Sequence, residues 1–332
     1  MSSVNFLEKL LDGVEVEWKA LEAITKVTIG EFVHKRNQNS AADFPVYNGG
    51  ISNTGFYDKY NNTGNKIIVS ARGANAGFVN RISSPYWAGN SCYSIGVKNV
   101  GEINWIYVFY FLKNSESKLI GEQQKGGIPA VSKKQIESFR IPIPCPDNPK
   151  RSLEIQAEIV RILDTFTELT AELTAELTAR KKQYNYYRDQ LLTFEEEEGT
   201  TKGTKSAKKV EWKTLGEVGE FTYGFVAKAQ DTGNARFVRI TDINNNGKLL
   251  QTDAKFVDIS EHNKKFILKK DDLLMARTGA TFGKTMIFEE DYPAIYAGFL
   301  IKLNFDKKLI NPKYYWHFAQ DRKSTRLNSS HS

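Results

Sequence analysis

The chain has 332 residues, a length typical of about two domains, and a composition that excludes several protein classes. Its 40% hydrophobic and 26% charged residues describe a globular sequence that is neither disordered nor fibrous. Lys and Arg outnumber Asp and Glu by 46 to 39, and the net charge of +7 suits a polyanionic partner. No run of about 18 apolar residues predicts a membrane span, and Met1–Glu8 lacks the pattern of a secretory signal. The two cysteines, Cys92 and Cys145, are too few for a disulfide framework or a four-ligand zinc site, so we expect a cytoplasmic protein that binds no metal.

A short segment near the N-terminus is repeated 194 residues later. Val16–Leu21 reads VEWKAL, and Val210–Leu215 reads VEWKTL. Two further matches keep the same order along the chain. They pair Ile68–Ala74 with Leu273–Gly279, and Asn104–Tyr110 with Asn311–His317. The sequences between these landmarks differ. The pattern predicts two copies of one scaffold that carry different interiors and read two different targets.

The first copy, residues 1–150, has the features of a mixed α+β domain. Lys66–Ser70 is a short apolar run typical of a strand, and Trp105–Leu112 is an aromatic-rich helix candidate. The copy closes with Ile141–Pro146, where repeated proline favours an extended exit.

A long helix is predicted over Ser152–Phe194, a stretch without glycine or proline, with Ser152 as a plausible N-cap. The helix contains the low-complexity repeats Thr170–Leu173 and Thr174–Leu177, both Thr-Ala-Glu-Leu. Its apolar residues follow a 4-3-4-3-4 spacing, the seam of a coiled coil. The seam residues are Ile155, Ile159, Ile162, Phe166, Leu169 and Leu173.

After this spacer helix, residues 151–198, a polar linker spans 199–209 and the second copy spans 210–321. The second copy has no sequence like Gly126–Pro129 and no second long helix after it, so we expect it to be incomplete. The tail, 322–332, has no apolar period and looks non-native.

Two near matches to catalytic loops have simpler explanations. Gly279–Thr285 resembles a phosphate-binding loop, but it has three residues between its glycines where the motif requires four. We therefore predict a backbone turn there. Asn311–Tyr314 differs from the Asn-Pro-Pro-Tyr loop of amino-methyltransferases at Lys313, and a loop that opens an aromatic helix is expected instead.

A Glu-x-Lys pattern of metal-dependent nucleases occurs in both openings, at Glu17 with Lys19 and at Glu211 with Lys213. A structural strand edge explains it better than twin catalytic centres. The four histidines have no ligand spacing; they are His34, His262, His317 and His331. The sequence therefore predicts binding and no catalytic centre.

Basic and amide side chains lie among glycine and asparagine in the expected loops of both copies. Arg reads guanine edges, Asn reads adenine, and Lys mainly holds phosphate. Arg72 and Arg277 stand out because each follows a strand-like run and precedes a glycine turn at what we predict to be one repeat position. An ion pair inside each domain is the alternative for these two, and a solvated face is the alternative for the rest. The candidate DNA-binding residues are Lys35, Arg36, Arg72, Asn75, Arg81, Lys125, Lys133, Lys134, Arg236, Arg239, Lys264, Lys265, Arg277, Thr278 and Lys284.

With these motifs in hand, the chain resembles the specificity subunits of type I restriction-modification enzymes over about residues 5–321. The resemblance is carried by the two Val-Glu-Trp-Lys openings, by the segment 276–284 (ARTGATFGK), by Gly127–Ser132 with Ile141–Pro144, and by Glu154–Val160. The Thr-Ala-Glu-Leu repeats and Arg180–Asp189 are similar to the IC branch of that family.

The resemblance implies that each copy is a target-recognition domain for one half of a bipartite double-stranded DNA sequence. It implies that the long helix separates the copies and carries methylation (M) subunits, which motor-nuclease (R) subunits join. Catalysis, S-adenosylmethionine, ATP and magnesium would then belong to the partners, and this chain would hold no cofactor. The rival interpretation is a stand-alone or fused restriction or modification enzyme with its own catalytic centre.

The end of the chain departs from the family pattern, which continues into an exit segment and a second long helix antiparallel to the first. Because that distal helix is not in the sequence, we expect the seam to stay uncovered within one chain. Self-association, or dependence on a methylation subunit, is the expected consequence.

Overall fold

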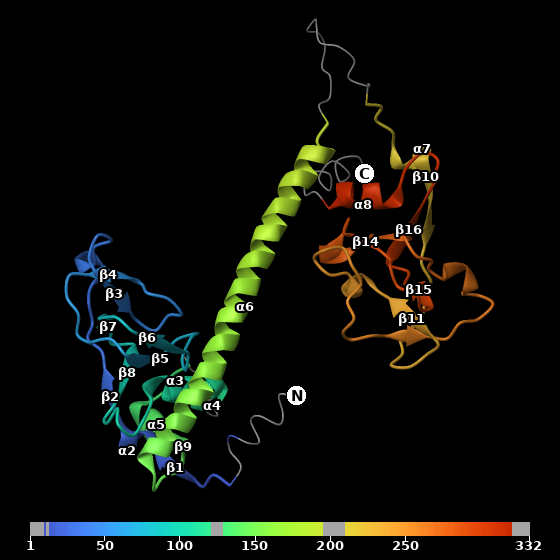
Figure 1. Cartoon of the computed structure of the whole chain (residues 1–332). Coiled ribbons are helices and arrows are strands. Elements are labelled where there is room, and N and C mark those ends of the chain that lie inside the picture. The colour runs from blue at the N-terminus through green and yellow to red at the C-terminus, as the bar shows by residue number, and fades with distance from the viewer. Residues whose placement is uncertain (1–9, 11–12, 121–128, 195–209, 321–332) are drawn as a thin grey trace, which may run out of the picture. The chain divides into compact units, whose positions relative to one another are not determined.

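The computed structural model describes residues 10, 13–120, 129–194 and 210–320 and divides into two compact units, residues 1–175 and 176–332 (Figure 1). Each unit is a mixed α+β domain, as predicted. The long helix α6 (Pro149–Leu192) is divided between the units: its residues up to 175 belong to the first unit, and those from 176 belong to the second. No helix in the described ranges is long and apolar enough to cross a membrane. The sequence-based divisions at residues 150, 198, 209 and 321 stay predictions.

The first unit contains a four-stranded antiparallel sheet, a three-stranded sheet and a two-stranded ribbon. The four strands lie in the order β2 (Thr25–Ile29), β8 (Cys92–Val97), β5 (Lys66–Ser70), β6 (Val79–Ile82). The three lie in the order β4 (Gly55–Tyr57), β3 (Phe44–Tyr47), β7 (Trp87–Ala88), and β3 is parallel to β7. The ribbon pairs β1 (Val16–Ala20) with β9 (Arg140–Pro144). The remaining elements are α2 (Leu21–Ile24), η1 (Lys35–Asn37), α3 (Trp105–Asn114), α4 (Glu116–Ile120) and α5 (Lys133–Ser138).

The second unit repeats the strand orders of both larger sheets. Its four-stranded sheet runs β10 (Gly219–Tyr223), β16 (Leu300–Phe305), β13 (Leu273–Ala276), β14 (Thr285–Ile287). Its three-stranded sheet runs β12 (Phe256–Val257), β11 (Ala235–Val238), β15 (Ala294–Tyr296), and β11 is parallel to β15. Its helical elements are α7 (Leu215–Val218), η2 (Ile240–Asp242), η3 (Lys264–Phe266), η4 (Gly279–Thr281) and α8 (Pro312–Ala319). The matching topology confirms that one scaffold occurs twice.

The aromatic helices form where the sequence predicts them, and each begins at an asparagine. The Asn104 side chain accepts from the N–H of Ile106 at 2.9 Å at the start of α3, and Asn311 accepts from the N–H of Lys313 at 2.8 Å at the start of α8. Such caps satisfy backbone donors that the first helical turn leaves unpaired. The prediction that an aromatic helix opens at Asn311–Tyr314 is therefore confirmed, but residues 312–314 already form its first turn and are not a loop.

The Val-Glu-Trp-Lys openings differ between the units. The first forms strand β1, which pairs with β9, whereas residues 210–214 form no strand. A strand requires a partner, and among the described residues the second unit has no counterpart of β9.

Two hairpin turns reveal how the units correspond residue by residue. The N–H of Ser70 donates to the carbonyl of Phe78 at 3.0 Å, and the N–H of Ala276 donates to that of Lys284 at 2.9 Å. In each turn, glycines with positive φ lie three and seven residues after this N–H donor. They are Gly73 and Gly77 in the first unit and Gly279 and Gly283 in the second. Ser70 and Ala276 therefore occupy the same position.

This correspondence corrects the sequence alignment by one residue. Arg72 matches Thr278, and Arg277 matches Ala71, so the prediction that the two arginines share one repeat position is wrong. An Ala-Arg dipeptide occurs in both units, but it stands one residue closer to the turn glycine in the first unit.

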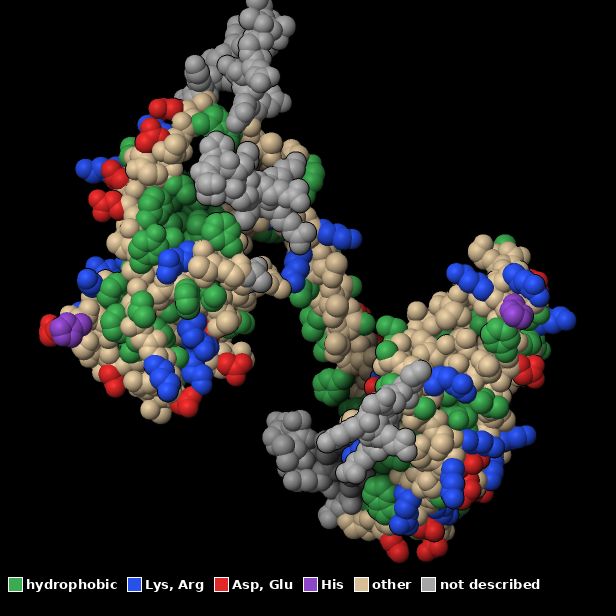
Figure 2. All heavy atoms as spheres, turned by 180° about the vertical axis from the view of Figure 1, so that it is seen from behind, with side chains coloured by type: hydrophobic (Ala, Val, Ile, Leu, Met, Phe, Trp, Pro, Cys, Tyr) green, Lys and Arg blue, Asp and Glu red, His purple; other side chains and the backbone are tan. Residues whose placement is uncertain are grey.

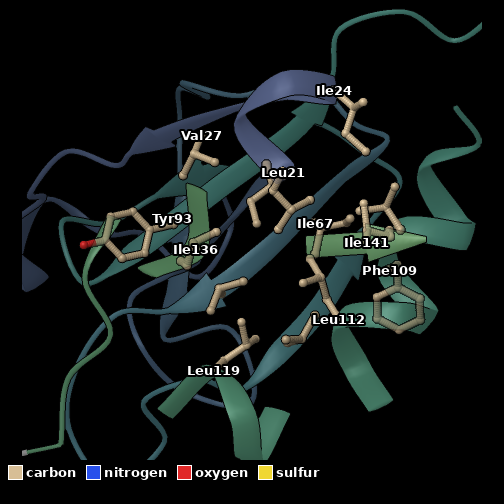
Figure 3. Close-up of a cluster of buried hydrophobic side chains, with 14 of the residues drawn as sticks. Leu21, Ile24, Val27, Ile67, Tyr93, Phe109, Leu112, Leu119, Ile136 and Ile141 are labelled. Carbon is tan, nitrogen blue, oxygen red and sulfur yellow. The ribbon is translucent and has the colours of Figure 1, made fainter. Parts of the chain in front are cut away.

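The core of the first unit lies between its four-stranded sheet, α2, α3, α5 and β9 (Figure 3). Leu21, Leu112, Ile136 and Ile141 contribute fully buried side chains from four different elements. In the second unit the buried side chains form three smaller clusters.

Helix α6 begins three residues earlier than predicted. The Asn148 side chain accepts from the N–H of Arg151 at 3.1 Å, and Pro149 fits the first helical turn, where its missing N–H costs nothing. Ser152 is thus inside the helix and not its N-cap. Its buried hydroxyl accepts from the side chain of Gln156 at 3.0 Å, and Gln156 in turn donates to the Glu102 carbonyl at 3.2 Å.

The expectation of a wholly uncovered seam is wrong for its first part. Ile155 is fully buried, Ile159 packs on the core of the first unit, and Ile162 is half-buried. Farther along, hydrophobic side chains reach the surface of α6 (Figure 2). These exposed residues, called the α6 stripe below, are Leu163, Phe166, Leu169, Leu173 and Leu177.

Candidate nucleic-acid interface

An exposed arginine of the second unit lies beside two aromatic rings. The guanidinium carbon of Arg277 lies 4.9 Å from the ring centre of Tyr223 and 5.9 Å from that of Phe299. Its Nε donates to the carbonyl of Gly298 at 3.0 Å. We call these four residues the Arg277 cluster.

Three neighbouring strands build the Arg277 cluster. Tyr223 ends β10, Arg277 follows β13, and Gly298 and Phe299 precede β16. A Cβ at Gly298 would lie 2.8 Å from a methyl carbon of Val226, so a glycine allows these loops to meet. Tyr223 is 63% exposed and Phe299 is 57% exposed, so the cluster faces solvent.

The cluster has the chemistry of a base- or phosphate-binding site. Stacking and one hydrogen bond orient the planar guanidinium, and its terminal nitrogens are left for a ligand. Among the described residues no carboxylate lies within ion-pairing distance of Arg277 or of Arg72. Within the described part of the chain, neither arginine therefore forms the internal ion pair that was the alternative.

Different side chains occupy the corresponding place in the first unit. Ile29, Ala71 and Ser91 stand where the second unit has Tyr223, Arg277 and Phe299. The N–H of Ser91 donates to the Asn48 side chain at 3.1 Å, so the loop after β3 contacts this position.

That loop lies close to Arg72. Gly49 adopts φ +79°, and a Cβ there would lie 3.1 Å from the Cβ of Ser91 and 3.5 Å from the Arg72 carbonyl. The Gly49 N–H donates to the Sγ of Cys92 at 3.0 Å, which anchors the loop on β8. Asn48, Gly49, Arg72 and Ser91 form the Arg72 cluster, a polar surface beside an exposed arginine.

Several other predicted DNA-binding residues of the first unit are exposed. Lys35 and Arg36 lie on η1, Asn75 lies in the turn after β5, and Lys133 and Lys134 begin α5. Lys133 is 3.3 Å from Glu137 in an exposed pair, which water screens. Lys125 lies outside the described residues.

Arg81 is engaged inside the first unit. Its Nη2 lies 3.0 Å from Oδ1 of Asp164 on α6, and its guanidinium carbon lies 5.2 Å and 5.5 Å from the rings of Phe109 and Tyr110. Arg81 therefore joins β6 to α3 and α6. This role is structural, and the sequence alone does not distinguish it from DNA binding.

The assignment of Arg236 to DNA binding is wrong, because the residue is only 4% exposed. Its Nη2 donates to the Leu250 carbonyl at 3.1 Å and lies 3.8 Å from the buried Asp242. Arg239 binds the same carboxylate through two nitrogens, at 2.7 Å and 3.1 Å. Hydrogen bonding to Asp242 raises the pKa of Arg239. Both arginines thus stabilise η2 and its carboxylate.

The remaining candidates in the second unit lie at or near the surface. Lys264 is paired with Glu261, Lys265 lies 5.1 Å from the ring of Phe266, and Thr278 is exposed before η4. The Nζ of Lys284 donates to the Ile243 carbonyl at 2.9 Å, so it ties the turn after β13 to the loop after η2.

Sequence reasoning missed the aromatic and amide members of both clusters. Tyr223 precedes Gly224 and Phe299 follows Gly298, and Asn48 precedes Gly49. A polar or aromatic residue beside a glycine at the end of a strand was the available signal. These pairs come from loops far apart in sequence, and the fold brings them together.

The rejected catalytic motifs are structural. Gly279–Thr285 forms the turn between β13 and β14, with no α-helix after it to bind phosphate. Glu17 lies 3.0 Å from Lys19, and Glu211 lies 3.2 Å from Lys213, in exposed pairs. Within the described ranges no group of three or more His, Cys, Asp and Glu side chains has the arrangement of a metal site.

Comparison with known proteins identifies relatives of the whole chain. The family described as type I restriction modification DNA specificity domain matches residues 14–180 and 207–332. The Escherichia coli type I restriction enzyme EcoR124I/EcoR124II specificity subunit is 34% identical over 99% of this chain and 81% of its own length. The E. coli type I restriction enzyme EcoprrI specificity subunit is 36% identical over 66% of this chain and 58% of its own length.

A solved structure has the same fold. The S subunit of a type I restriction-modification system from M. genitalium matches with a TM-score of 0.67 over 96% of this chain and 81% of that chain. The sequence identity is 17%, so the likeness concerns the fold alone.

Proposed function

The chain belongs to the family of type I restriction modification DNA specificity domains, and we propose that each of its two units reads one half of a bipartite double-stranded DNA target. The observation that carries this proposal is one scaffold that carries different side chains at corresponding positions of its two copies. The strand orders of the two units are equal, and Tyr223, Arg277 and Phe299 stand in the second unit where the first unit has Ile29, Ala71 and Ser91. Two similar frames with different recognition surfaces fit two different half-sites.

The Arg277 cluster is the proposed base-reading site of the second unit. A guanidinium with free terminal nitrogens donates two hydrogen bonds to the O6 and N7 of guanine. The Arg72 cluster is the proposed site of the first unit, with Asn48 and Ser91 as further hydrogen-bonding groups. Lys35, Arg36, Lys133 and Lys134 would hold phosphates and supply affinity that depends on salt.

Methylation and restriction are proposed to reside in partner subunits, in the cytoplasm. Family membership supports partners that carry S-adenosylmethionine, ATP and magnesium. The α6 stripe supports a protein partner, because Phe166 is 62% exposed and several leucines lie beside it. Burying such a side chain contributes about 1.5–3 kcal/mol. A methylation subunit or a second copy of this chain would cover the stripe.

Methyl transfer to DNA tests this division of labour. The purified chain is incubated with DNA and S-adenosylmethionine, with and without a methylation subunit. We expect transfer only when both proteins are present, at adenines of one bipartite sequence. Transfer by the chain alone would contradict the proposal and favour an enzyme with its own catalytic centre.

Sedimentation tests the proposed cover of the α6 stripe. We expect the chain to self-associate, or to bind a methylation subunit, and we expect Phe166→Ser with Leu173→Ser to abolish that association. Glu172→Ser is the matched control on the same helix. A monomer that binds neither partner would contradict the proposal.

A further inference from the structure

Three neighbouring strands of the first unit place two lysines on either side of a glycine. Lys26 of β2 pairs with Gly96 of β8, and the antiparallel register of β5 with β8 places Lys66 on the other side of that glycine. Neighbouring strands lie about 4.8 Å apart, so about 10 Å separates the two lysine backbones. Because glycine has no side chain, the space between the lysines is left open. Lys26, Gly96 and Lys66 are called the lysine row below.

The lysine row lines a hollow in the surface of the first unit. Thr28, Glu31, Asn61 and Asn62 supply further polar side chains to the wall of this hollow. One position along each of the three strands, the side chains are buried in the core; they are Val27, Ile67 and Ile95. Side chains alternate along a strand, so the lysine row lies on the face of the sheet opposite that core.

The side chain of Lys66 leans over the glycine, since a Cβ at Gly96 would lie 3.5 Å from its Cε. The Nζ of Lys66 donates to Oδ1 of the buried Asn62 at 3.5 Å, and Asn62 donates in turn to Asn61 at 2.9 Å. An ammonium carries three N–H donors, so two of those of Lys66 are left for a ligand. Among the side chains that the structure describes, no carboxylate lies within ion-pairing distance of either lysine.

The second unit carries the opposite charges at the same positions of the scaffold. The strand registers place Glu220, Asn304 and Asp272 where the first unit has the lysine row. The Nζ of Lys302 lies 2.7 Å from Oδ2 of Asp272, and the Asn304 side chain donates to the hydroxyl of Thr222 at 3.1 Å. Polar groups of the second unit thus satisfy one another at this place, whereas the lysine row holds two positive charges around an open space.

We propose that the lysine row binds one backbone phosphate of the DNA and that the second unit makes no equivalent contact, an inference that rests on the proposed function. Two like charges on either side of an open space repel each other and attract an anion placed between them. Lysine holds phosphate as a point charge and reads no base, so this contact positions the first unit on its half-site. Lys66 begins β5 and Arg72 follows its end, six residues or about 20 Å away. A DNA strand spans that separation with about six phosphates.

The test measures DNA affinity against salt concentration for the intact chain with a methylation subunit, on a duplex of its selected bipartite sequence. Lys26→Gln with Lys66→Gln should weaken binding by about 5- to 10-fold near 0.1 M salt. The slope of log K against log salt should fall by about 0.9, the contribution of one phosphate. The preferred sequence of both half-sites should stay the same. Lys118→Gln with Lys150→Gln, which removes two exposed charges from helices α4 and α6, is the matched control and should leave affinity and slope unchanged.

Two further variants test the geometry of the hollow. Gly96→Asn keeps both lysine charges but places between them the side chain that the second unit has there, and it should also weaken DNA binding. Glu31→Gln removes the negative charge from the wall of the hollow and should strengthen DNA binding. The melting temperature of each variant shows that the first unit remains folded.

The outcomes separate this proposal from the proposed function. Sequence-specific binding with unchanged affinity and slope in the double lysine variant would overturn the phosphate contact and leave the proposed function standing. Equal weakening by the control pair would overturn it too, because any loss of positive charge would then have the same effect. Absence of sequence-specific binding by the unmodified chain would overturn both. Inorganic phosphate is the probe for the other source of the anion: if it slows hydrogen exchange at residues 94–97 while the double variant binds DNA normally, the lysine row binds free phosphate and not DNA.

Discussion

The guanidinium of Arg81 lies 3.0 Å from the carboxylate of Asp164 and joins strand β6 to the long helix α6 within the first unit. Both side chains are about one-third exposed, so solvent screens the pair in part. The rings of Phe109 and Tyr110 beside the guanidinium add a second attraction.

Arg81→Ala should therefore lower the free energy of unfolding of the first unit by about 1 kcal/mol and leave DNA affinity unchanged. Chemical denaturation and DNA titration measure the two quantities. Arg151→Ala removes an exposed pair with Glu154 and should change the unfolding free energy by less than about 0.5 kcal/mol. A loss of DNA affinity without a loss of stability would place Arg81 at the DNA.

Asp242→Ala should be far more damaging to the second unit. The substitution leaves the charge of Arg236 buried without a carboxylate, a change that costs about 3–5 kcal/mol. Denaturant unfolding measures the loss, and Asp231→Ala, which removes an exposed pair with Lys255, serves as the control. Unchanged stability combined with weaker DNA binding would show that Arg236 reaches the ligand.

The contact between α6 and α8 should respond to pH. The Oη of Tyr184 lies 2.8 Å from Nδ1 of His317, and burial, followed by Lys248 and Lys313, lowers the pKa of that histidine. The folded unit therefore disfavours the protonated imidazole more than the unfolded chain does. Its stability should fall as the pH drops through about 6.5, the pKa of an unperturbed histidine.

His317→Gln should flatten this dependence. The melting temperature of the second unit, compared at pH 7.5 and pH 5.5, gives the readout. His262→Gln, at an exposed position, should leave the difference as it is in the unmodified chain. An equal drop on acidification with and without His317 would mean that other groups cause it.

The Thr-Ala-Glu-Leu repeats should set the gap between the two half-sites. Four residues add about 6 Å to a helix and about 40° beyond a full turn. One added repeat in α6 should then lengthen the preferred gap by about two base pairs and leave both half-sites the same. The same insertion within residues 199–209 leaves α6 unchanged and is the control. An unaltered gap with the longer helix would show that the helix is not the spacer.

The scaffold was readable from the sequence wherever local signals repeat. The openings, the two asparagine-capped aromatic helices and the long helix without glycine or proline all carry such signals. The strand orders were not predicted, since pairing such as that between β2 and β8 joins residues more than 60 positions apart. The missing strand at residues 210–214 has the same origin, because a strand depends on a partner elsewhere in the chain.

The candidate site was predicted only in part. The position of Arg277 after a strand and before a glycine turn is confirmed, but Tyr223 and Phe299 come from other loops. Arg236 illustrates the opposite failure. Its basic side chain suggested DNA, and the buried Asp242 that neutralises it lies on another element. Burial and ion pairing decide which basic residues are free, and neither is visible in a linear pattern.

Selection of bound sequences from a random double-stranded DNA library tests the central claim, that two copies of one scaffold read two different half-sites. The chain is used together with a methylation subunit, and the selection is repeated with Arg277→Ala and with Arg72→Ala. We expect a bipartite sequence with a fixed gap. Arg277→Ala should relax a position in one half and Arg72→Ala a position in the other, each at a cost of about 1–3 kcal/mol if the arginine reads a base. A single continuous sequence, or one half altered by both substitutions, would contradict the account.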